Sequence, residues 1–231
     1  MASEVDIANL ALGHLGDAAT VSSIDPPEGS PQAEHCQRFY PIARDSLLEM
    51  HLWNFAMKRQ ALPLLTNDWP EWLYCYGLPS DALNPITVLP SDALDDYSLG
   101  VMPGNDDFTT WPGYIGVGAV VGVPTTYEPQ PFTIETLASG DQVLYTNVAN
   151  AVLRYSAYVT DTTQFSPLFV TTLSWQLASF LAGPLIKGDA GAEEAKRCQV
   201  MMQRYMDMAV SSDSNQRKVN VRQSVSWMNG R

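Results

Sequence analysis

Apolar residues recur at spacings of three and four in the N-terminal part of the chain, which is the period of a helix. Ser3 can cap a first helix, because Asp6 follows three residues later in the spacing of a capping box, and this helix ends near Gly16. A Ser-Pro pair, a capping residue followed by proline at the first helical position, then predicts a second helix over residues 30–50.

The same pattern returns towards the C-terminus. Another Ser-Pro pair predicts a third helix over residues 166–186, and an apolar stripe predicts a fourth from about 192 to 211, with a turn at 188–191 between them. On the fourth helix, Glu193 and Arg197 have the spacing at which opposite charges on an exposed face attract.

The third predicted helix contains no charged residue, and its length would suit a membrane span. Polar residues such as Thr171, Ser174 and Gln176 lower its apolar character. We therefore expect a helix that is buried in protein, and no membrane span.

Between the helices, short apolar runs are interrupted by proline, aspartate and glycine, which is typical of strands. The predicted strands lie within residues 51–65, 72–78, 86–89, 132–137, 142–146 and 151–159. The sequence Ala-Ser-Gly-Asp at 138–141 predicts a hairpin turn. Residues 100–123 are rich in glycine and apolar residues and match neither pattern clearly.

These elements predict an α+β fold. Each helix has one apolar face to bury, so the two N-terminal and two C-terminal helices are expected to pack as a discontinuous bundle formed by residues 1–50 and 164–213. Residues 51–163 would form an inserted β-rich domain, and residues 214–231 an extended C-terminal tail.

Charge is distributed unevenly along the chain. The net charge is −12, from 25 acidic and 13 basic residues, and residues 60–153 hold eleven acids without a single lysine or arginine. This balance argues against a protein that wraps nucleic acid by neutralising phosphates. Two interpretations stay open: a solvated acidic surface that aids solubility, or a surface that faces DNA without gripping it.

The tail has the opposite character. Basic residues alternate there with valines and a tryptophan. A frayed terminus is the simple interpretation, but this alternation also fits an arm that docks on a partner.

Residues typical of catalysis or metal binding are sparse. The histidines His14, His35 and His51 accompany no catalytic motif, and no phosphate-binding loop or calcium loop is found. The three cysteines are far apart in sequence and form no CxxC pair, which fits a reduced cytosolic protein. We expect no enzyme, no metal and no cofactor.

Several motifs occur together in a fixed order. They are Ile7-Ala8-Asn9-Leu10-Ala11-Leu12-Gly13-His14-Leu15-Gly16, Ala43-Arg44-Asp45 with Leu47-Leu48, Trp53-Asn54-Phe55, and Leu78-Pro79-Ser80-Asp81-Ala82-Leu83. This combination resembles the podovirus tail tubular protein A family, the bacteriophage head-to-tail adaptor or connector. The match is close over roughly the first third of the chain. The basic residue that usually ends the last motif is Asn84 here.

The resemblance implies a structural protein of the virion neck, assembled in the host cytoplasm. Its partners would be copies of itself in a dodecameric ring, the portal protein, and the tail nozzle protein. Double-stranded DNA would pass through the ring without specific binding during ejection. No catalysis is implied.

The resemblance also assigns expected contacts. Portal-contact candidates are Arg217, Lys218, Val219, Val221, Arg222, Val225 and Trp227. Candidates facing the channel or nozzle are Asp92, Asp95, Asp96, Asp106 and Asp107. Subunit-contact candidates are Arg44, Asp45 and Trp53. Arg44 and Asp45 would pair either within one subunit or between subunits, and Trp53 would also anchor the first strand on the helices.

Alternative functions predict different behaviour. A different neck or tail-completion protein would occupy a similar place in a phage of another tail type. A tail-associated wall hydrolase would need carboxylates in a cleft and measurable turnover. An acidic DNA mimic would be a stable monomer.

Overall fold

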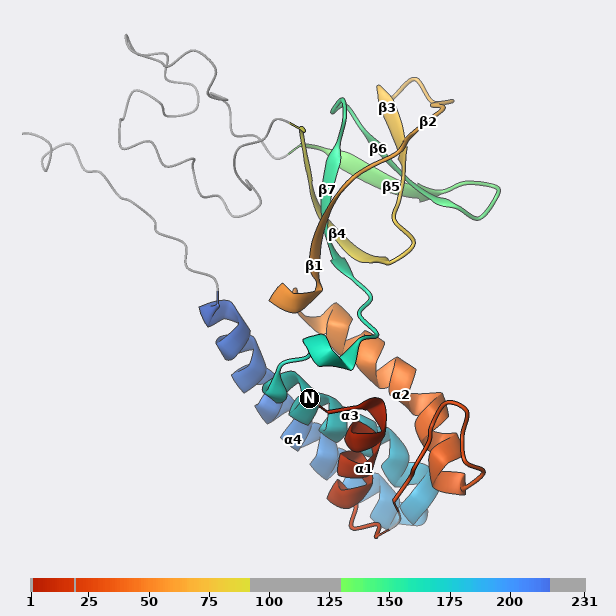
Figure 1. Cartoon of the computed structure of the whole chain (residues 1–231), viewed down its shortest axis with the longest axis vertical. Coiled ribbons are helices and arrows are strands. Elements are labelled where there is room, and N and C mark those ends of the chain that lie inside the picture. The colour runs from red at the N-terminus through yellow and green to blue at the C-terminus, as the bar shows by residue number, and fades with distance from the viewer. Residues whose placement is uncertain (1, 19, 92–129, 217–231) are drawn as a thin grey trace, which may run out of the picture. The chain divides into compact units, whose positions relative to one another are not determined.

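The computed structural model describes residues 2–18, 20–91 and 130–216. Within these residues the fold is α+β, with four α-helices and two antiparallel sheets (Figure 1). The chain divides into two compact units. The helical unit combines Met1–Met57 with Tyr158–Arg217, and the β unit contains Lys58–Ala157.

The two N-terminal helices begin at their predicted caps. Helix α1 spans Glu4–His14, and the Ser3 hydroxyl accepts a 3.1 Å hydrogen bond from the Asp6 amide while the Asp6 carboxylate accepts one from the Ser3 amide. Helix α2 spans Pro31–Met50, with the Ser30 hydroxyl accepting from the Ala33 amide. Both predicted helices are confirmed.

The two C-terminal helices are joined more tightly than the sequence predicts. Helix α3 spans Pro167–Ile186 and helix α4 spans Gly188–Asn215. The chain reverses at Lys187 and Gly188, which have φ values of 61° and 62°, so the turn begins one residue before the predicted range 188–191. Residues 188–191 instead form the first turn of α4.

On α4, Arg197 pairs with a different glutamate from the one that the sequence predicts. The Arg197 Nε donates a 2.8 Å hydrogen bond to Glu194, three residues away, rather than to Glu193. Arg197 also donates to the backbone oxygen of His14 at 3.0 Å. This second bond fixes where the guanidinium lies, so the nearer carboxylate is the one it reaches.

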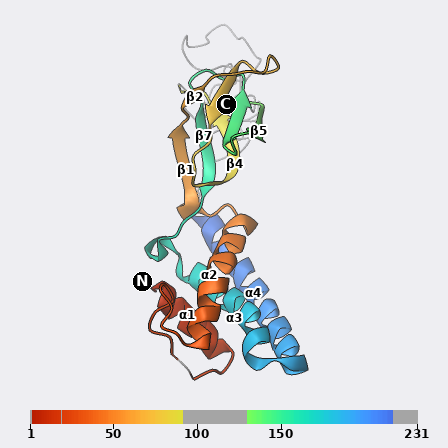
Figure 2. The same cartoon turned by 90° about the vertical axis from the view of Figure 1, so that its right-hand side faces the viewer.

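Helix α3 is the core of the helical unit. It packs against α1, α2 and α4, and lies among them in both views (Figures 1 and 2). It is long and apolar enough to cross a membrane, but most of its length is buried inside the unit. Two of its buried hydroxyls bond within the helix: Thr172 donates to the Leu168 carbonyl and Ser179 to the Gln176 carbonyl. The helix therefore buries these hydroxyls without partners on other elements.

The β unit contains two sheets. The strands are β1 (Met57–Ala61), β2 (Leu64–Leu65), β3 (Tyr74–Gly77), β4 (Ala82–Leu89), β5 (Phe132–Thr136), β6 (Gln142–Thr146) and β7 (Val152–Ala157). One sheet has the order β1-β7-β4 and the other the order β2-β3-β6-β5. The predicted hairpin between β5 and β6 is confirmed, with Gly140 at a φ of 91° in its turn.

The core of the β unit draws on both sheets. Tyr76 and Leu144 from the four-stranded sheet are buried with Val88, Leu153 and Tyr155 from the three-stranded sheet. The Tyr76 hydroxyl donates to the Val148 carbonyl at 2.8 Å, so this large polar side chain is buried with its hydrogen bond satisfied.

The start of the first predicted strand is wrong. Residues 51–56 are not extended pairing partners, because η1 (Asn54–Ala56) is a 3₁₀ turn closed by the Ala56 amide donating to the Trp53 carbonyl. The strand begins only at Met57. Trp53 and Phe55 instead pack against Phe169 of α3, within the helical unit.

Candidate functional site

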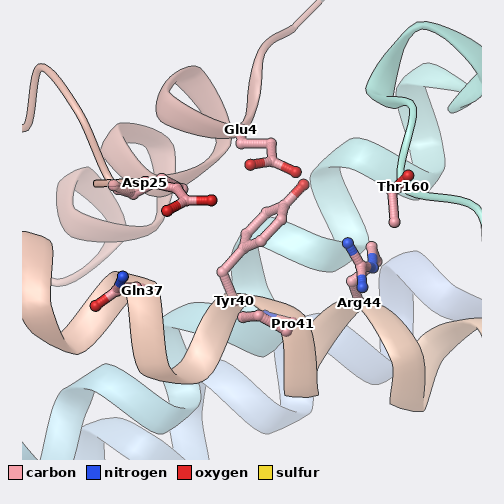
Figure 3. A pocket seen from close by; sticks show the side chains of 8 residues that line it. Glu4, Asp25, Gln37, Tyr40, Pro41, Arg44 and Thr160 are labelled. Atoms are coloured by element: carbon pink, nitrogen blue, oxygen red, sulfur yellow. The ribbon is translucent and has the colours of Figure 1, made fainter. Parts of the chain in front are cut away.

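A polar hollow of about 350 Å³ opens on the helical unit (Figure 3). We call it the Tyr40 hollow, and it is lined by Glu4, Ile24, Asp25, Gln37, Tyr40, Pro41, Arg44 and Thr160. Helix α2 supplies its floor, the start of α1 supplies Glu4, and the segment before α3 supplies Thr160. It thus joins residues that are far apart in sequence.

Tyr40 is the central residue of this hollow. Its ring rises from α2 with the hydroxyl directed towards Glu4 in Figure 3, yet only 2% of the residue is exposed. Among the described residues the hydroxyl has no hydrogen-bond partner. Burial raises the pKa of Tyr40, and the nearby carboxylates of Glu4 and Asp45 raise this pKa further, against the opposing effect of Arg44. The phenol is therefore neutral and able to donate or accept one hydrogen bond.

Arg44 and Asp45 pair within the chain. The Arg44 Nε donates to Asp45 Oδ1 at 2.8 Å, and 12% of the Arg44 side chain and 36% of the Asp45 side chain are exposed. Arg44 lies one helical turn after Tyr40 and lines the same hollow as Thr160 (Figure 3). Two of the predicted subunit-contact residues therefore lie at the Tyr40 hollow or next to it.

A second hollow of about 400 Å³ continues from the first. It shares Glu4, Ile24, Asp25 and Thr160 with the Tyr40 hollow. It adds hydroxyl and carboxylate side chains, among them Ser3, Ser22, Ser23, Asp161 and Thr162. Together the two hollows form a polar surface rich in hydrogen-bond acceptors.

Trp53 needs a correction. Its side chain has no exposed surface, so it is not a subunit contact in this fold. The indole nitrogen donates to the Leu47 carbonyl at 2.8 Å, and the ring meets Phe169 edge-on with centroids 5.0 Å apart. Phe55 packs on the same two rings. Trp53 joins the end of α2 to α3 instead.

The three histidines lie in separate surroundings. His14 stacks on Trp175 with ring centroids 3.6 Å apart, and His35 lies near Phe39. His51 Nε2 lies 3.1 Å from an oxygen of Asp213. Across residues 2–18, 20–91 and 130–216, no group of three His, Cys, Asp or Glu side chains is arranged to hold a metal ion.

Other predicted contact residues lie outside the described residues. These are the acidic candidates Asp92, Asp95, Asp96, Asp106 and Asp107, and the portal candidates Arg217, Lys218, Val219, Val221, Arg222, Val225 and Trp227. Sequence reasoning missed Tyr40, Glu4, Asp25 and Thr160. A tyrosine on the apolar face of α2 gives no sign that its hydroxyl lacks a partner.

The chain was also compared with known proteins. No family model matches it, and no curated protein matches it.

Proposed function

We propose that the chain is a structural head-to-tail adaptor of a tailed bacteriophage, forming a dodecameric ring between the portal and the tail nozzle. The observation that carries this proposal is the Tyr40 hollow, where a buried hydroxyl lacks a partner beside Glu4 and Arg44. An unpartnered buried hydroxyl costs about 1–3 kcal/mol. A neighbouring subunit that fills the hollow would supply the missing partner.

The arrangement of the helices supports the same proposal. Two of the motifs that carry the family resemblance belong to the helical packing. Ala43–Leu48 lies on α2, and Trp53–Phe55 links the end of α2 to α3 through contacts with Phe169. We infer that the four helices form the discontinuous bundle of an adaptor, with the β unit as its insertion. Exposed apolar residues on α2, such as Ile42 and Met50, would add contact area in the ring.

Assembly with the portal tests the proposal directly. The purified chain and the portal of the same phage are mixed, and the complex is analysed by light scattering and electron microscopy. A closed ring of copies on the portal is expected. A chain that stays monomeric beside its portal, or one that turns over a cell-wall substrate, would overturn the proposal.

Tyr40→Phe separates the assembly role from a local folding role. If a neighbouring subunit forms a hydrogen bond with the Tyr40 hydroxyl, the free energy of unfolding of the variant monomer should be higher than that of the unmodified chain by about 1 kcal/mol. Ring formation should then be weaker. Tyr205→Phe, on α4 and outside the hollow, is the matched control. A Tyr40→Phe variant that forms rings as readily as the control would remove the hollow from the subunit contact.

The docking arm has its own test. Deletion of residues 215–231 should weaken binding to the portal, because the predicted portal-contact residues all lie in this segment. Unchanged portal binding would contradict the arm and leave the ring proposal standing.

A further inference from the structure

The β unit carries an aromatic hollow that the adaptor proposal does not use. It has a volume of about 200 Å³. Its lining consists of the three aromatic residues Trp69, Trp72 and Tyr145 and the two acidic residues Glu71 and Glu135. Trp69 is 58% exposed, which is unusual for a side chain of this size.

The four-stranded sheet supplies two residues of this hollow, Tyr145 and Glu135. Tyr145 on β6 lies opposite Cys75 on β3 and Thr133 on β5. Glu135 is two residues beyond Thr133, so the alternation of side chains places its carboxylate on the same face as Tyr145. Trp72 packs on this face against Cys75 and Tyr145.

The loop before β3 holds the tryptophans in place. Asn67 accepts a 3.0 Å hydrogen bond from the Trp69 amide and donates through its side-chain amide to the Trp72 carbonyl. The Leu73 amide donates to the side chain of Asn147, also at 3.0 Å. The two indole rings therefore project from a backbone that is already fixed, which lowers the entropy lost when a ligand binds.

The electrostatics of the hollow favour a cation. Burial raises the pKa of Tyr145, and Cys75 raises it further. The carboxylates of Glu135 and Asp68 also raise this pKa, because they place negative charge near the ring. Residues 60–153 contain no lysine or arginine to neutralise that charge. The remaining bases of the segment 58–157 are Lys58, Arg59 and Arg154. Lys58 donates to Asp81 at 2.6 Å, and Arg59 and Arg154 make interactions of their own.

We propose that the aromatic hollow binds the guanidinium of an arginine side chain presented by a partner protein. Indole faces attract cations, and a planar guanidinium can stack on an aromatic ring while donating two hydrogen bonds to a carboxylate. Lysine offers the charge without the planar stack. The inference does not depend on the adaptor proposal, because it concerns only the β unit and a basic side chain.

Indole NMR of the full chain tests this inference with a small probe. Protein carrying ¹⁵N-tryptophan gives one indole signal for each of its six tryptophans. The variants Trp69→Phe and Trp72→Phe identify the signals of Trp69 and Trp72, because each variant lacks one of them. Acetyl-arginine amide is titrated in, with acetyl-citrulline amide as the uncharged control of the same shape and acetyl-lysine amide as the second cation. Saturable shifts of the Trp69 and Trp72 signals with arginine, weaker with lysine and absent with citrulline, are expected.

Two variants then locate the binding groups. Trp69→Ala, and separately Glu71→Gln with Glu135→Gln, should each weaken arginine binding about tenfold, while Glu193→Gln in the helical unit should leave it unchanged. The double glutamine variant keeps the aromatic rings, so it tests charge even if Trp69→Ala disturbs the loop. Equal shifts with citrulline, or arginine binding that survives in the double glutamine variant, would overturn the proposal.

Discussion

The Nε2 atom of His51 lies 3.1 Å from Oδ2 of Asp213. His51 is the residue at which α2 ends, and Asp213 lies in the last turn of α4. The Asn54 amide donates to the same carboxylate at 3.2 Å, and the Asn54 side chain donates to the Asp213 carbonyl at 2.7 Å. One buried aspartate thus joins the ends of two helices to the turn η1.

Asp213→Ala should lower the free energy of unfolding of the helical unit by about 1–3 kcal/mol, because the Asn54 amide loses its buried acceptor. Asp213→Asn keeps one acceptor oxygen and should lose less. Urea denaturation followed by the helical circular dichroism signal measures both variants. Asp207→Asn, an exposed carboxylate of the same helix, is the control, and equal stability of all three variants would contradict the role of Asp213.

The stability of the helical unit should depend on the protonation of His14. Burial against Trp175, with a smaller effect from the charge of Arg197, lowers the pKa of His14 below its ordinary value of 6.5. The unfolded chain therefore takes up this proton at a higher pH than the folded chain does. As the pH falls below about 6.5, the free energy of unfolding should decrease, until the pH passes the folded pKa of His14.

Arg197→Met separates the two causes of that shift. Removing the guanidinium should raise the pKa of His14 in the folded chain, since a positive charge no longer opposes protonation. Lys196→Met, an exposed neighbour, is the control. NMR titration of the His14 ring measures both, and an unchanged His14 pKa in Arg197→Met would show that burial acts alone.

The thiols should be unreactive until the chain unfolds. Cys36, Cys75 and Cys198 are all free and buried, and burial raises the pKa of each, that of Cys36 to about 11. Thiolate is the reactive form, so both the ionisation and the access of a reagent are suppressed. Labelling with Ellman's reagent at pH 8 should be negligible in the native protein and complete in denaturant. Fast labelling of a native thiol would contradict this packing.

Two glycines in helices should respond oppositely to alanine. A Cβ at Gly191 would lie 3.0 Å from the Ala182 carbonyl oxygen, so Gly191→Ala should force α3 and α4 apart and destabilise the unit. A Cβ at Gly13 would meet nothing within 4 Å, so Gly13→Ala should stabilise α1 by up to about 1 kcal/mol. Thermal unfolding of the two variants checks the sign of each effect.

Local signals in the sequence predicted the helices well. Ser3, Ser30 and Ser166 each accept a hydrogen bond from the amide three residues on, as their capping positions required. These signals depend on neighbours within one turn, so they survive without knowledge of the fold. The hairpin turn around Gly140 belongs to the same class.

Features that depend on distant contacts could not be predicted. The turn between α3 and α4 uses a positive φ at Lys187 as well as at Gly188, and a lysine gives no signal of this conformation, so the predicted turn begins one residue too late. The partner of Arg197 was misjudged because its bond to the His14 carbonyl spans 183 residues. The Tyr40 hollow is not predictable from the sequence for the same reason, since Glu4 and Thr160 come close to Tyr40 only in the folded chain.

The β unit leaves and returns to the helical unit along two strands that are neighbours in one sheet. Strand β1 begins at Met57, and β7, next to it in the order β1-β7-β4, ends at Ala157. Because β1 and β7 are neighbours in one sheet, the two ends of the inserted segment lie close together. Insertions or deletions between them can then accumulate during evolution without altering how the four helices meet. A loop joining residues 57 and 158 is thus a natural design for a minimal helical scaffold.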